Sequence, residues 1–262
     1  MCPILFQLGH FHVYAYGFFV VLGFCVAPVL SVLKIRKSGI RLPLENVADL
    51  FFYTVLSAFL GSRILFVLIN FDVYRQHPLQ MFKIWEGGLV FYGGLVPAAI
   101  VAFAYMRWHR LPTWKLADLI SPLIALGLSF GRIGCFFAGC CYGRESILPW
   151  AVTFRNPDSL ARLNVPLHPT QLYDAVNGLT IFFFLSWMSK RKTFDGQIFW
   201  LFVLLYAITR FFIEIFRGDP RGFLFREALS TSQGIGILLA ILSLFMLFYV
   251  KRRYQRHKDG CS

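Results

Sequence analysis

Three arginines lie inside or at the ends of long apolar stretches of the sequence: Arg63, Arg132 and Arg210. A guanidinium at the centre of a membrane costs roughly 2.5–3.5 kcal/mol on insertion scales, so each needs a polar interior or a ligand. Glu214 follows Arg210 by four residues, a spacing that allows a self-neutralising pair on one helix face. Three guanidiniums against one such carboxylate leave positive charge unpaired. We therefore expect an anion at membrane depth, and a lipid phosphate, which arginine binds bidentately, is the abundant candidate.

The richest local pattern is GRIGCFFAGCCYGR at 131–144, which combines Arg132 with four glycines and three cysteines. Glycines let the backbone approach a ligand and offer N–H groups to it, while the arginine supplies charge. Cys135, Cys140 and Cys141 leave three interpretations open. They are a metal site, although the spacing is not a usual zinc pattern, a disulfide if the loop faces an oxidising compartment, and a cysteine nucleophile that forms a thioester.

A dense group of polar residues, HPTQLYD at 168–174, precedes and opens another apolar stretch. Pro169 is a normal residue for a helix start, and its neighbours could simply cap the helix. Histidine, glutamine and tyrosine side chains in such a short segment could equally serve a reaction. Both interpretations stand at this stage.

A glycine-rich motif, GGLVFYGG at 87–94, follows Trp85 and Glu86 and precedes Pro97. Glycines in membrane helices often serve helix packing. They also suit a re-entrant backbone, which membranes tolerate only where it lines a cavity or is buried in protein. The flanking residues favour an interfacial elbow over a uniform helix.

The elements that must position these groups are seven apolar stretches of about 20 residues, with few charged residues in any of them. They cover residues 13–33, 50–71, 89–106, 116–134, 171–188, 197–216 and 231–250. With 57% apolar and only 15% charged residues among 262, the chain is not an ordinary soluble, disordered, collagen-like or disulfide-framework protein. We expect an all-α membrane bundle of seven transmembrane helices, a single domain over 1–262 with an extracytoplasmic loop region at 135–168.

Charge predicts the orientation of this bundle. The 26 Lys and Arg against 13 Asp and Glu give +13, but long apolar runs separate the basic residues, which argues against a nucleic-acid binder. Fifteen basic residues follow the first, third, fifth and seventh stretches, against eight in the longer opposite connections. The positive-inside rule then places the C terminus in the cytoplasm and the N terminus outside. Residues 1–11 lack Lys and Arg and a small-residue cleavage site, so we interpret 13–33 as a retained span.

Taken in chain order, the motifs resemble the prolipoprotein diacylglyceryl transferases. The resemblance extends through nearly the whole chain and includes Tyr16-Gly17, Gly61-Ser62-Arg63, the EGGL and YGGL halves of the elbow at 86–95, GRIG at 131–134, HPTQLY at 168–173, RFFIEIFR at 210–217 with Asp219-Pro220, and Ser232-Gln233.

This resemblance implies a seven-span enzyme of the bacterial inner membrane with its N terminus outside. Members transfer the diacylglyceryl group of phosphatidylglycerol to the lipobox cysteine thiol in the signal peptide of a preprolipoprotein. The products are a thioether and glycerol phosphate. The resemblance implies neither a cofactor nor a metal, and no nucleic-acid partner.

The resemblance also assigns site residues. Arg132 and Arg210 would hold the phosphodiester and stabilise the charge on the departing phosphate while a thiolate attacks the glyceryl carbon. Tyr92 and His168 are the candidate proton handlers. The expected substrate-binding set is Tyr16, Arg63, Gly134, Cys135, Gln171, Tyr173, Glu214 and Arg217.

Three positions depart from the family pattern. Tyr92 stands where members often carry the histidine proposed as base, and Cys135 and Cys140 replace a typical Asn and an acidic residue. Tyrosine, with an ordinary pKa near 10, could act as a base if nearby arginines favour the phenolate. Alternatively, a thiol of pKa near 8.5 needs little help from a base to lose its proton when positive charge surrounds it.

The departures keep open a sibling enzyme with another thiol or lipid acceptor. A non-catalytic lipid or anion transporter is a further alternative, although the halves show no repeat.

Overall fold

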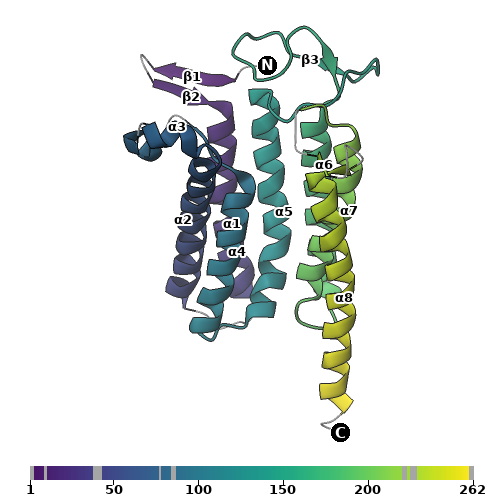
Figure 1. The fold of residues 1–262 in the computed structure, drawn as a ribbon. Helices are drawn as coiled ribbons and strands as arrows, with labels where there is room; N and C mark the ends of the chain where they lie inside the picture. The colour runs from purple at the N-terminus through teal and green to yellow at the C-terminus, as the bar shows by residue number, and fades with distance from the viewer. Residues whose placement is uncertain are drawn as a thin grey trace. The chain divides into compact units, whose positions relative to one another are not determined.

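The structure is a computed structural model that describes residues 3–8, 11–37, 43–76, 78–83, 87–219, 223–224 and 229–259. The described residues are mainly helical (Figure 1). The fold divides into two compact units, one formed by Met1–Ser31 with Ala117–Ser262 and the other by Val32–Leu116. The single domain over 1–262 stays a prediction.

Each of the seven predicted stretches forms a helix. They are α1 (Ala15–Lys37), α2 (Leu44–Ile69), α4 (Phe91–Trp108), α5 (Thr113–Ala138), α6 (Thr170–Met188), α7 (Gln197–Ile215) and α8 (Thr231–Asp259), and a short α3 (Phe71–Gln76) and two 3-10 turns, η1 (Pro78–Phe82) and η3 (Ser189–Arg191), lie between them. Among the described helices, α1, α2, α5, α7 and α8 are long and apolar enough to cross a membrane. The apolar pattern therefore predicted the helices correctly, while the count of seven spans stays a prediction.

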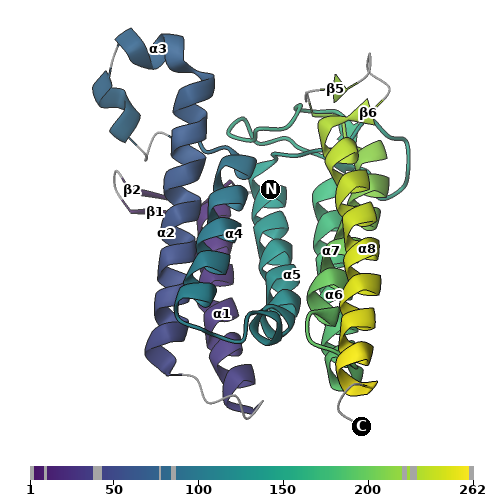
Figure 2. The same cartoon turned by 60° about the horizontal axis from the view of Figure 1, so that its bottom comes forward.

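Helices α5, α6 and α7 share the main core of the first unit. Ala125, Ile181, Leu185, Ile198 and Phe202 are buried together there. Helix α6 packs on α7, and α7 packs on α8, as Figure 2 shows. The start of α8 carries a capping box, because the Ser230 hydroxyl accepts from the Gln233 N–H and the Gln233 side chain accepts from the Ser230 N–H.

A buried carboxylate fixes α5 against the start of α7. Asp118 is 3% exposed and accepts hydrogen bonds from the backbone N–H groups of Gly196 and Phe199 at 2.8 and 3.0 Å. Lys192 binds the same carboxylate at 3.2 Å and Asp195 at 3.0 Å. Burial alone lowers the pKa of Lys192, but the bonds to Asp195 and Asp118 outweigh it, so this pKa is raised.

The crossing of α5 and α6 is close because of Gly178. A Cβ at this position would overlap the hydroxyl of Ser129 and lie 2.9 Å from the carbonyl oxygen of Ala125. Ser129 is fixed in turn, since its hydroxyl donates to the Ala175 carbonyl at 2.9 Å. The two backbones therefore meet without an intervening side chain.

We expect Gly178→Ala to lower the free energy of unfolding in detergent by about 1–3 kcal/mol, because the helices must separate to admit the methyl group. Gly127→Ala is the matched control, since a Cβ at Gly127 in α5 meets nothing within 4 Å. Equal stability of the two variants would contradict this account of the crossing.

In the second unit, α2 and α4 also cross at glycines. A Cβ at Gly93 would lie 2.5 Å from Leu65 Cβ, and one at Gly94 would lie 2.8 Å from the Ala58 carbonyl oxygen. The second glycine pair of the elbow thus serves helix packing. The first pair differs, because Gly87 and Gly88 adopt φ of +84° and +79°, in the left-handed region that favours glycine. Trp85 and Glu86 lie outside the described residues.

Small antiparallel ribbons lie beyond the helices. Strands β1 (Ile4–Leu8) and β2 (Phe11–Tyr14) pair near the N terminus, β3 (Val152–Thr153) pairs with β4 (Pro166–Leu167), and β5 (Phe223–Leu224) pairs with β6 (Leu229–Ser230). Phe154, Ala161 and Leu167 form a buried core for the connection between α5 and α6. Helix α5 continues to Ala138, so the irregular part of the predicted 135–168 loop begins at Gly139.

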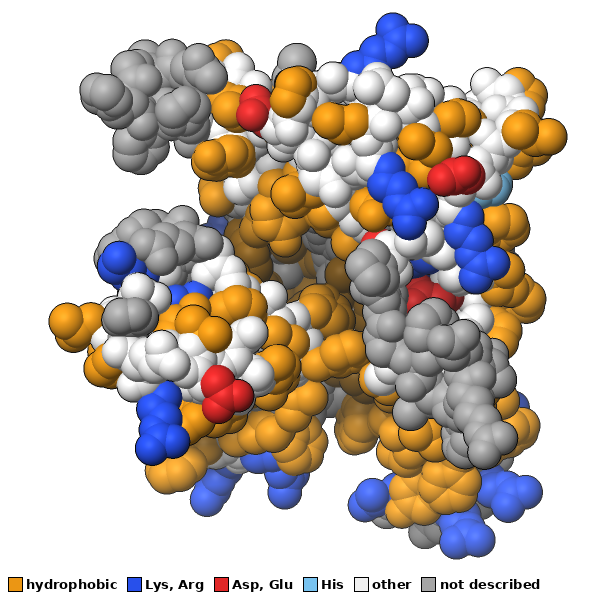
Figure 3. Space-filling model, turned by 45° about the horizontal axis from the view of Figure 1, so that its top comes forward, with side chains coloured by type: hydrophobic (Ala, Val, Ile, Leu, Met, Phe, Trp, Pro, Cys, Tyr) orange, Lys and Arg blue, Asp and Glu red, His pale blue; other side chains and the backbone are white. Residues whose placement is uncertain are grey.

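The exposed faces of the helices are apolar. On α8, Leu238, Phe245 and Phe248 are exposed by 63–70%. Hydrophobic side chains cover much of the surface visible in Figure 3. Such surfaces are unsuited to water and match a hydrocarbon environment.

Candidate active site

Three arginines of the first unit converge on Asp174. Its Oδ2 lies 3.2 Å from Arg132 Nη1, 3.8 Å from Arg210 Nη1 and 3.8 Å from Arg217 Nη1. Helix α5 supplies Arg132, α6 supplies Asp174, α7 supplies Arg210, and Arg217 follows α7 directly. The Asp174 side chain is only 3% exposed. The expected convergence of Arg132 and Arg210 is thus present in the structure, with a carboxylate at its centre.

Two further carboxylates organise the arginines. Glu214 binds Arg210 across one helical turn, so the predicted i,i+4 pair is confirmed. The Ser230 hydroxyl donates to Glu214 at 3.1 Å and ties this pair to the start of α8. Asp219 binds Arg217 through both carboxylate oxygens, at 3.0 and 3.1 Å. The expectation of a single carboxylate at this depth is therefore wrong.

The arginines keep different numbers of donors for a ligand. Arg132 has the most exposed side chain of the three, at 19%, and among the described residues its one ion pair is with Asp174. The Nη1 groups of Arg210 and Arg217 are buried and donate no hydrogen bond within the described residues. Arg217 gives its Nε and Nη2 to Asp219, which makes it a positioning group. Although burial lowers it, the hydrogen bond from Arg217 to Asp219 raises the pKa of this guanidinium.

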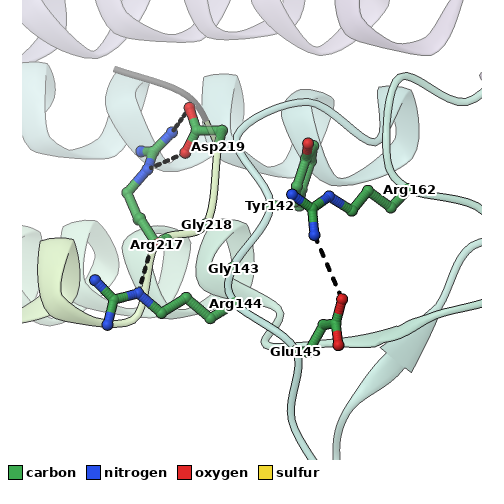
Figure 4. Close-up of a pocket in the computed structure, with 8 residues that line it drawn as sticks. All are labelled: Tyr142, Gly143, Arg144, Glu145, Arg162, Arg217, Gly218 and Asp219. Carbon is green, nitrogen blue, oxygen red and sulfur yellow. Dashed lines mark hydrogen bonds and ion pairs between the residues drawn. The ribbon is translucent and has the colours of Figure 1, made fainter. Parts of the chain in front are cut away.

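A cavity of about 500 Å³ lies beside Arg217 (Figure 4). Arg144 donates from Nε to the Arg217 carbonyl at 3.1 Å, and Arg162 pairs with Glu145 across 3.4 Å on another part of the wall. The remaining lining residues are Tyr142, Gly143, Gly218 and Asp219. The wall combines three guanidiniums with two carboxylates, so it suits a polar, phosphate-bearing group better than an acyl chain.

The three cysteines form one cluster. The Sγ atoms of Cys135, Cys140 and Cys141 lie within 4.8 Å of one another, and the thiols are free. Buried Thr170 and Gln171 fix the loop that carries Cys140 and Cys141. Their side chains donate to the carbonyls of Cys141 and Cys140, respectively, each at 2.8 Å. The polar residues that open α6 thus fix the cysteine loop, a role that neither sequence interpretation named.

Hydrogen bonds within the cluster, and nearby positive charge, lower the pKa of one cysteine. Hydrogen bonds from the Cys135 and Cys140 thiols lower the pKa of the Cys141 thiol, against the opposing effect of burial, and Arg217 and Arg132 lower it further. The cluster therefore lies within the electrostatic range of the arginines.

Glycines at 131 and 134 do not present N–H groups to a ligand, contrary to expectation, because both lie within α5. Gly134 instead allows α1 to approach. A Cβ there would lie 3.2 Å from the backbone of Tyr16 and 3.3 Å from Phe19 Cβ. Tyr16 is 47% exposed at the start of α1, next to the end of α5 that carries Cys135. This position is compatible with the substrate-binding role expected for Tyr16.

His168 belongs to a chain of hydrogen bonds. Trp150 Nε1 donates to the Tyr173 hydroxyl at 2.8 Å, and that hydroxyl lies 3.2 Å from His168 Nδ1. Since the indole can only donate, the Tyr173 hydroxyl accepts from Trp150, and the tautomer of the imidazole decides whether that hydroxyl donates to Nδ1 or accepts from it. Within the described residues, the His168 side chain forms neither an ion pair nor a hydrogen bond with the three arginines. Its role as a proton handler stays a prediction.

Arg63 and Tyr92 belong to the second unit. The Arg63 guanidinium donates to five backbone carbonyls, those of Gln80, Met81, Lys83, Gly87 and Gly88, at 2.6–3.3 Å. All five of its N–H groups donate to these carbonyls, so none is left for the expected contact with a lipid phosphate. Arg63 instead fixes the backbone segments that carry the five carbonyls. Tyr92 lies at the start of α4 and is 37% exposed.

We expect Arg63→Lys to lower the free energy of unfolding by about 2 kcal/mol, because an ammonium group cannot serve five carbonyls at these positions. Arg75→Lys, in the exposed last turn of α3, is the control. A variant that unfolds like the parent protein but loses lipid binding would assign Arg63 to the substrate instead.

Comparison with known proteins identifies the family of this chain. Residues 3–249 match the prolipoprotein diacylglyceryl transferase family. The chain belongs to this family. It is 34% identical over 246 residues to a phosphatidylglycerol–prolipoprotein diacylglyceryl transferase of Clostridium tetani, with 94% of this chain and 96% of the relative covered. It is 34% identical over 254 residues to the enzyme of that name from Geobacter sulfurreducens, with 96% of each covered, and 37% identical over 217 residues to that of Pasteurella multocida, with 82% and 78% covered.

Membership of the diacylglyceryl transferase family and the five apolar helices together establish a multi-pass membrane protein. Asp174 was not among the site residues expected from the sequence, although it is the group on which the arginines converge. Its signal was available, since a carboxylate one turn inside an apolar helix needs a cationic partner. Thr170 was missed for a similar reason, because a helix-capping role seemed sufficient for it.

Proposed function

We propose that the protein transfers the diacylglyceryl group of phosphatidylglycerol to the lipobox cysteine of a preprolipoprotein in the bacterial inner membrane. The single observation that carries the proposal is the convergence of Arg132 and Arg210 on Asp174, in a chain whose relatives bear the name of this activity. The substrates never leave the bilayer, so the phosphate must be recognised at membrane depth.

In this proposal Arg132 and Arg210 bind the phosphodiester. The acceptor thiolate attacks the glyceryl carbon, the carbon–oxygen bond to phosphate breaks, and its electron pair leaves on the phosphate oxygen. Two guanidiniums aimed at that oxygen stabilise the charge that accumulates there. Glu214 and Arg217 hold Arg210 in place, and Tyr16 borders the lipid. Gln171 and Tyr173 shape the site through the cysteine loop and His168.

We also propose seven spans with the N terminus outside and the C terminus in the cytoplasm. Seven helices match the predicted stretches, and basic residues lie in the last turns of α4 and α8. This orientation puts the residue 139–169 connection and its ion pairs on the outer face, where the signal peptide presents its lipobox cysteine.

The test is a lipid-modification assay with the purified protein, phosphatidylglycerol and a lipobox peptide under reducing conditions. We expect the peptide to gain the mass of one diacylglyceryl group, and a peptide with serine in place of the acceptor cysteine to gain none. Tyr92, Cys135 and Cys140 favour one second candidate, a sibling enzyme with another thiol or lipid acceptor. An unmodified peptide beside a correctly folded protein would favour that sibling.

A further inference from the structure

The cysteine cluster has the composition and spacing of a metal site. Three Sγ atoms lie within 4.8 Å of one another. Zinc binds thiolates at about 2.3 Å in tetrahedral geometry, which separates the sulfurs by about 3.8 Å. Each pair of sulfurs therefore has to approach by no more than about 1 Å, a change that side-chain rotation can supply.

The loop that carries these thiols is built to hold them. Cys141 adopts φ of +59°, and Gly139 adopts +77° where a side chain would collide with the Ser159 hydroxyl. These conformations turn the chain back at the end of α5, so that Cys140 and Cys141 face Cys135. The bonds from fully buried Thr170 and Gln171 to the loop carbonyls fix that turn. Ligand side chains that the fold already holds close together in this way suit metal binding.

The charges around the cluster also suit a bound metal. Three thiolates and one Zn²⁺ carry a net charge of −1, and both Arg132 and Arg217 interact electrostatically with Cys141. The positive groups therefore stabilise the loaded site. Among the described residues, the cluster supplies three thiol ligands and no fourth side chain. Three protein ligands with an open fourth position are typical of catalytic zinc sites, whereas structural sites are closed by four.

We propose that Cys135, Cys140 and Cys141 bind a zinc ion whose fourth position takes the acceptor thiol. This inference rests on the proposed function and gives the missing base a substitute, because a thiol that coordinates zinc is deprotonated. The acceptor thiol displaces a water from the metal, and its proton passes to that water. The thiolate then attacks the glyceryl carbon while the phosphate oxygen departs with the bonding pair toward Arg132. The site differs from the metal-free reaction that the family resemblance implies.

Cobalt is the probe for the test, because tetrahedral thiolate-bound Co²⁺ has characteristic visible and charge-transfer absorption. The full-length protein, purified in detergent, is reduced with a phosphine, stripped with a chelator and titrated with Co²⁺. We expect one equivalent to bind, Zn²⁺ to displace it, and Cys135→Ser, Cys140→Ser and Cys141→Ser each to lose the charge-transfer band. Cys25→Ser, which changes an exposed cysteine of α1, is the matched control and should keep it.

Acceptor binding is tested on the cobalt-loaded protein. A lipobox peptide should shift the visible bands, and the peptide with serine at the acceptor position should not. A fully reduced protein without the cobalt bands, or a Cys140→Ser variant that retains them, would overturn the site. Bands that ignore the thiol peptide would overturn its role in the reaction.

The transfer assay separates this inference from the proposed function. We expect chelation to slow transfer at least tenfold and Zn²⁺ to restore it. Full transfer by the stripped protein and by Cys140→Ser would leave the proposed function standing and overturn the zinc site. Cobalt binding that responds to the peptide, in a protein that never modifies it, would instead support the site and contradict the proposed function.

Discussion

Arg132→Lys and Arg210→Lys are each expected to reduce diacylglyceryl transfer by about 100-fold to 1,000-fold, the usual effect of losing one preorganised donor to a developing oxyanion. Lysine keeps the charge but presents a point charge on a flexible stem, and it cannot form a planar bidentate contact with phosphate. Arg132 should show the effect clearly, since its one ion pair among the described residues is with Asp174. The rate is measured as mass gain of the lipobox peptide at fixed phosphatidylglycerol.

Arg191→Lys is the matched control for this pair. Its guanidinium lies over the Trp187 ring, 4.5 Å from the centroid, at the connection of α6 and α7. The same chemical change there should leave transfer within about twofold of the parent rate, as expected for an exposed site away from the arginine cluster. If lysine at 132 and 210 supports the parent rate with the variants correctly inserted, guanidinium recognition of the phosphate is wrong.

Asp174→Asn is expected to lower the free energy of unfolding in mixed micelles by about 3–5 kcal/mol, the usual cost of removing one partner from a buried ion pair. The reason is specific to this site, because one carboxylate serves three guanidiniums. Asparagine keeps the shape of the side chain and removes the charge, so Arg132, Arg210 and Arg217 would repel one another across a low dielectric.

The control for this variant is Asp195→Asn, which removes a carboxylate that is 42% exposed and pairs with Lys192. An exposed pair contributes about 0–1 kcal/mol, so the control should unfold close to the parent protein. A similar small effect for Asp174→Asn would show that Glu214 and Asp219 suffice as counter-ions. The site would then keep its arrangement without the shared carboxylate.

Much of the fold was predictable from the sequence. Each of the seven predicted apolar stretches forms a helix. Length and apolarity are local properties of a sequence, and a backbone in hydrocarbon must satisfy its own hydrogen bonds. The pair of Arg210 and Glu214 was predictable for the same reason, since four residues of spacing fix their relation on one helix. The convergence of Arg132 with Arg210 was expected from unpaired charge and from the family resemblance.

Only the tertiary structure decided which groups these side chains meet. Asp174 became the shared partner of three arginines because α5, α6 and α7 bring distant residues together, and spacing along the chain carries no such information. Arg63 was expected at the lipid, yet its guanidinium donates to backbone carbonyls, among them those of Gln80, Met81 and Gly87. The three sulfurs meet because Gly139 and Cys141 reverse the chain and Gln171 holds the turn from another helix. Local hydrophobicity determines where helices form, whereas the pairing of buried polar groups depends on contacts between segments far apart in the chain.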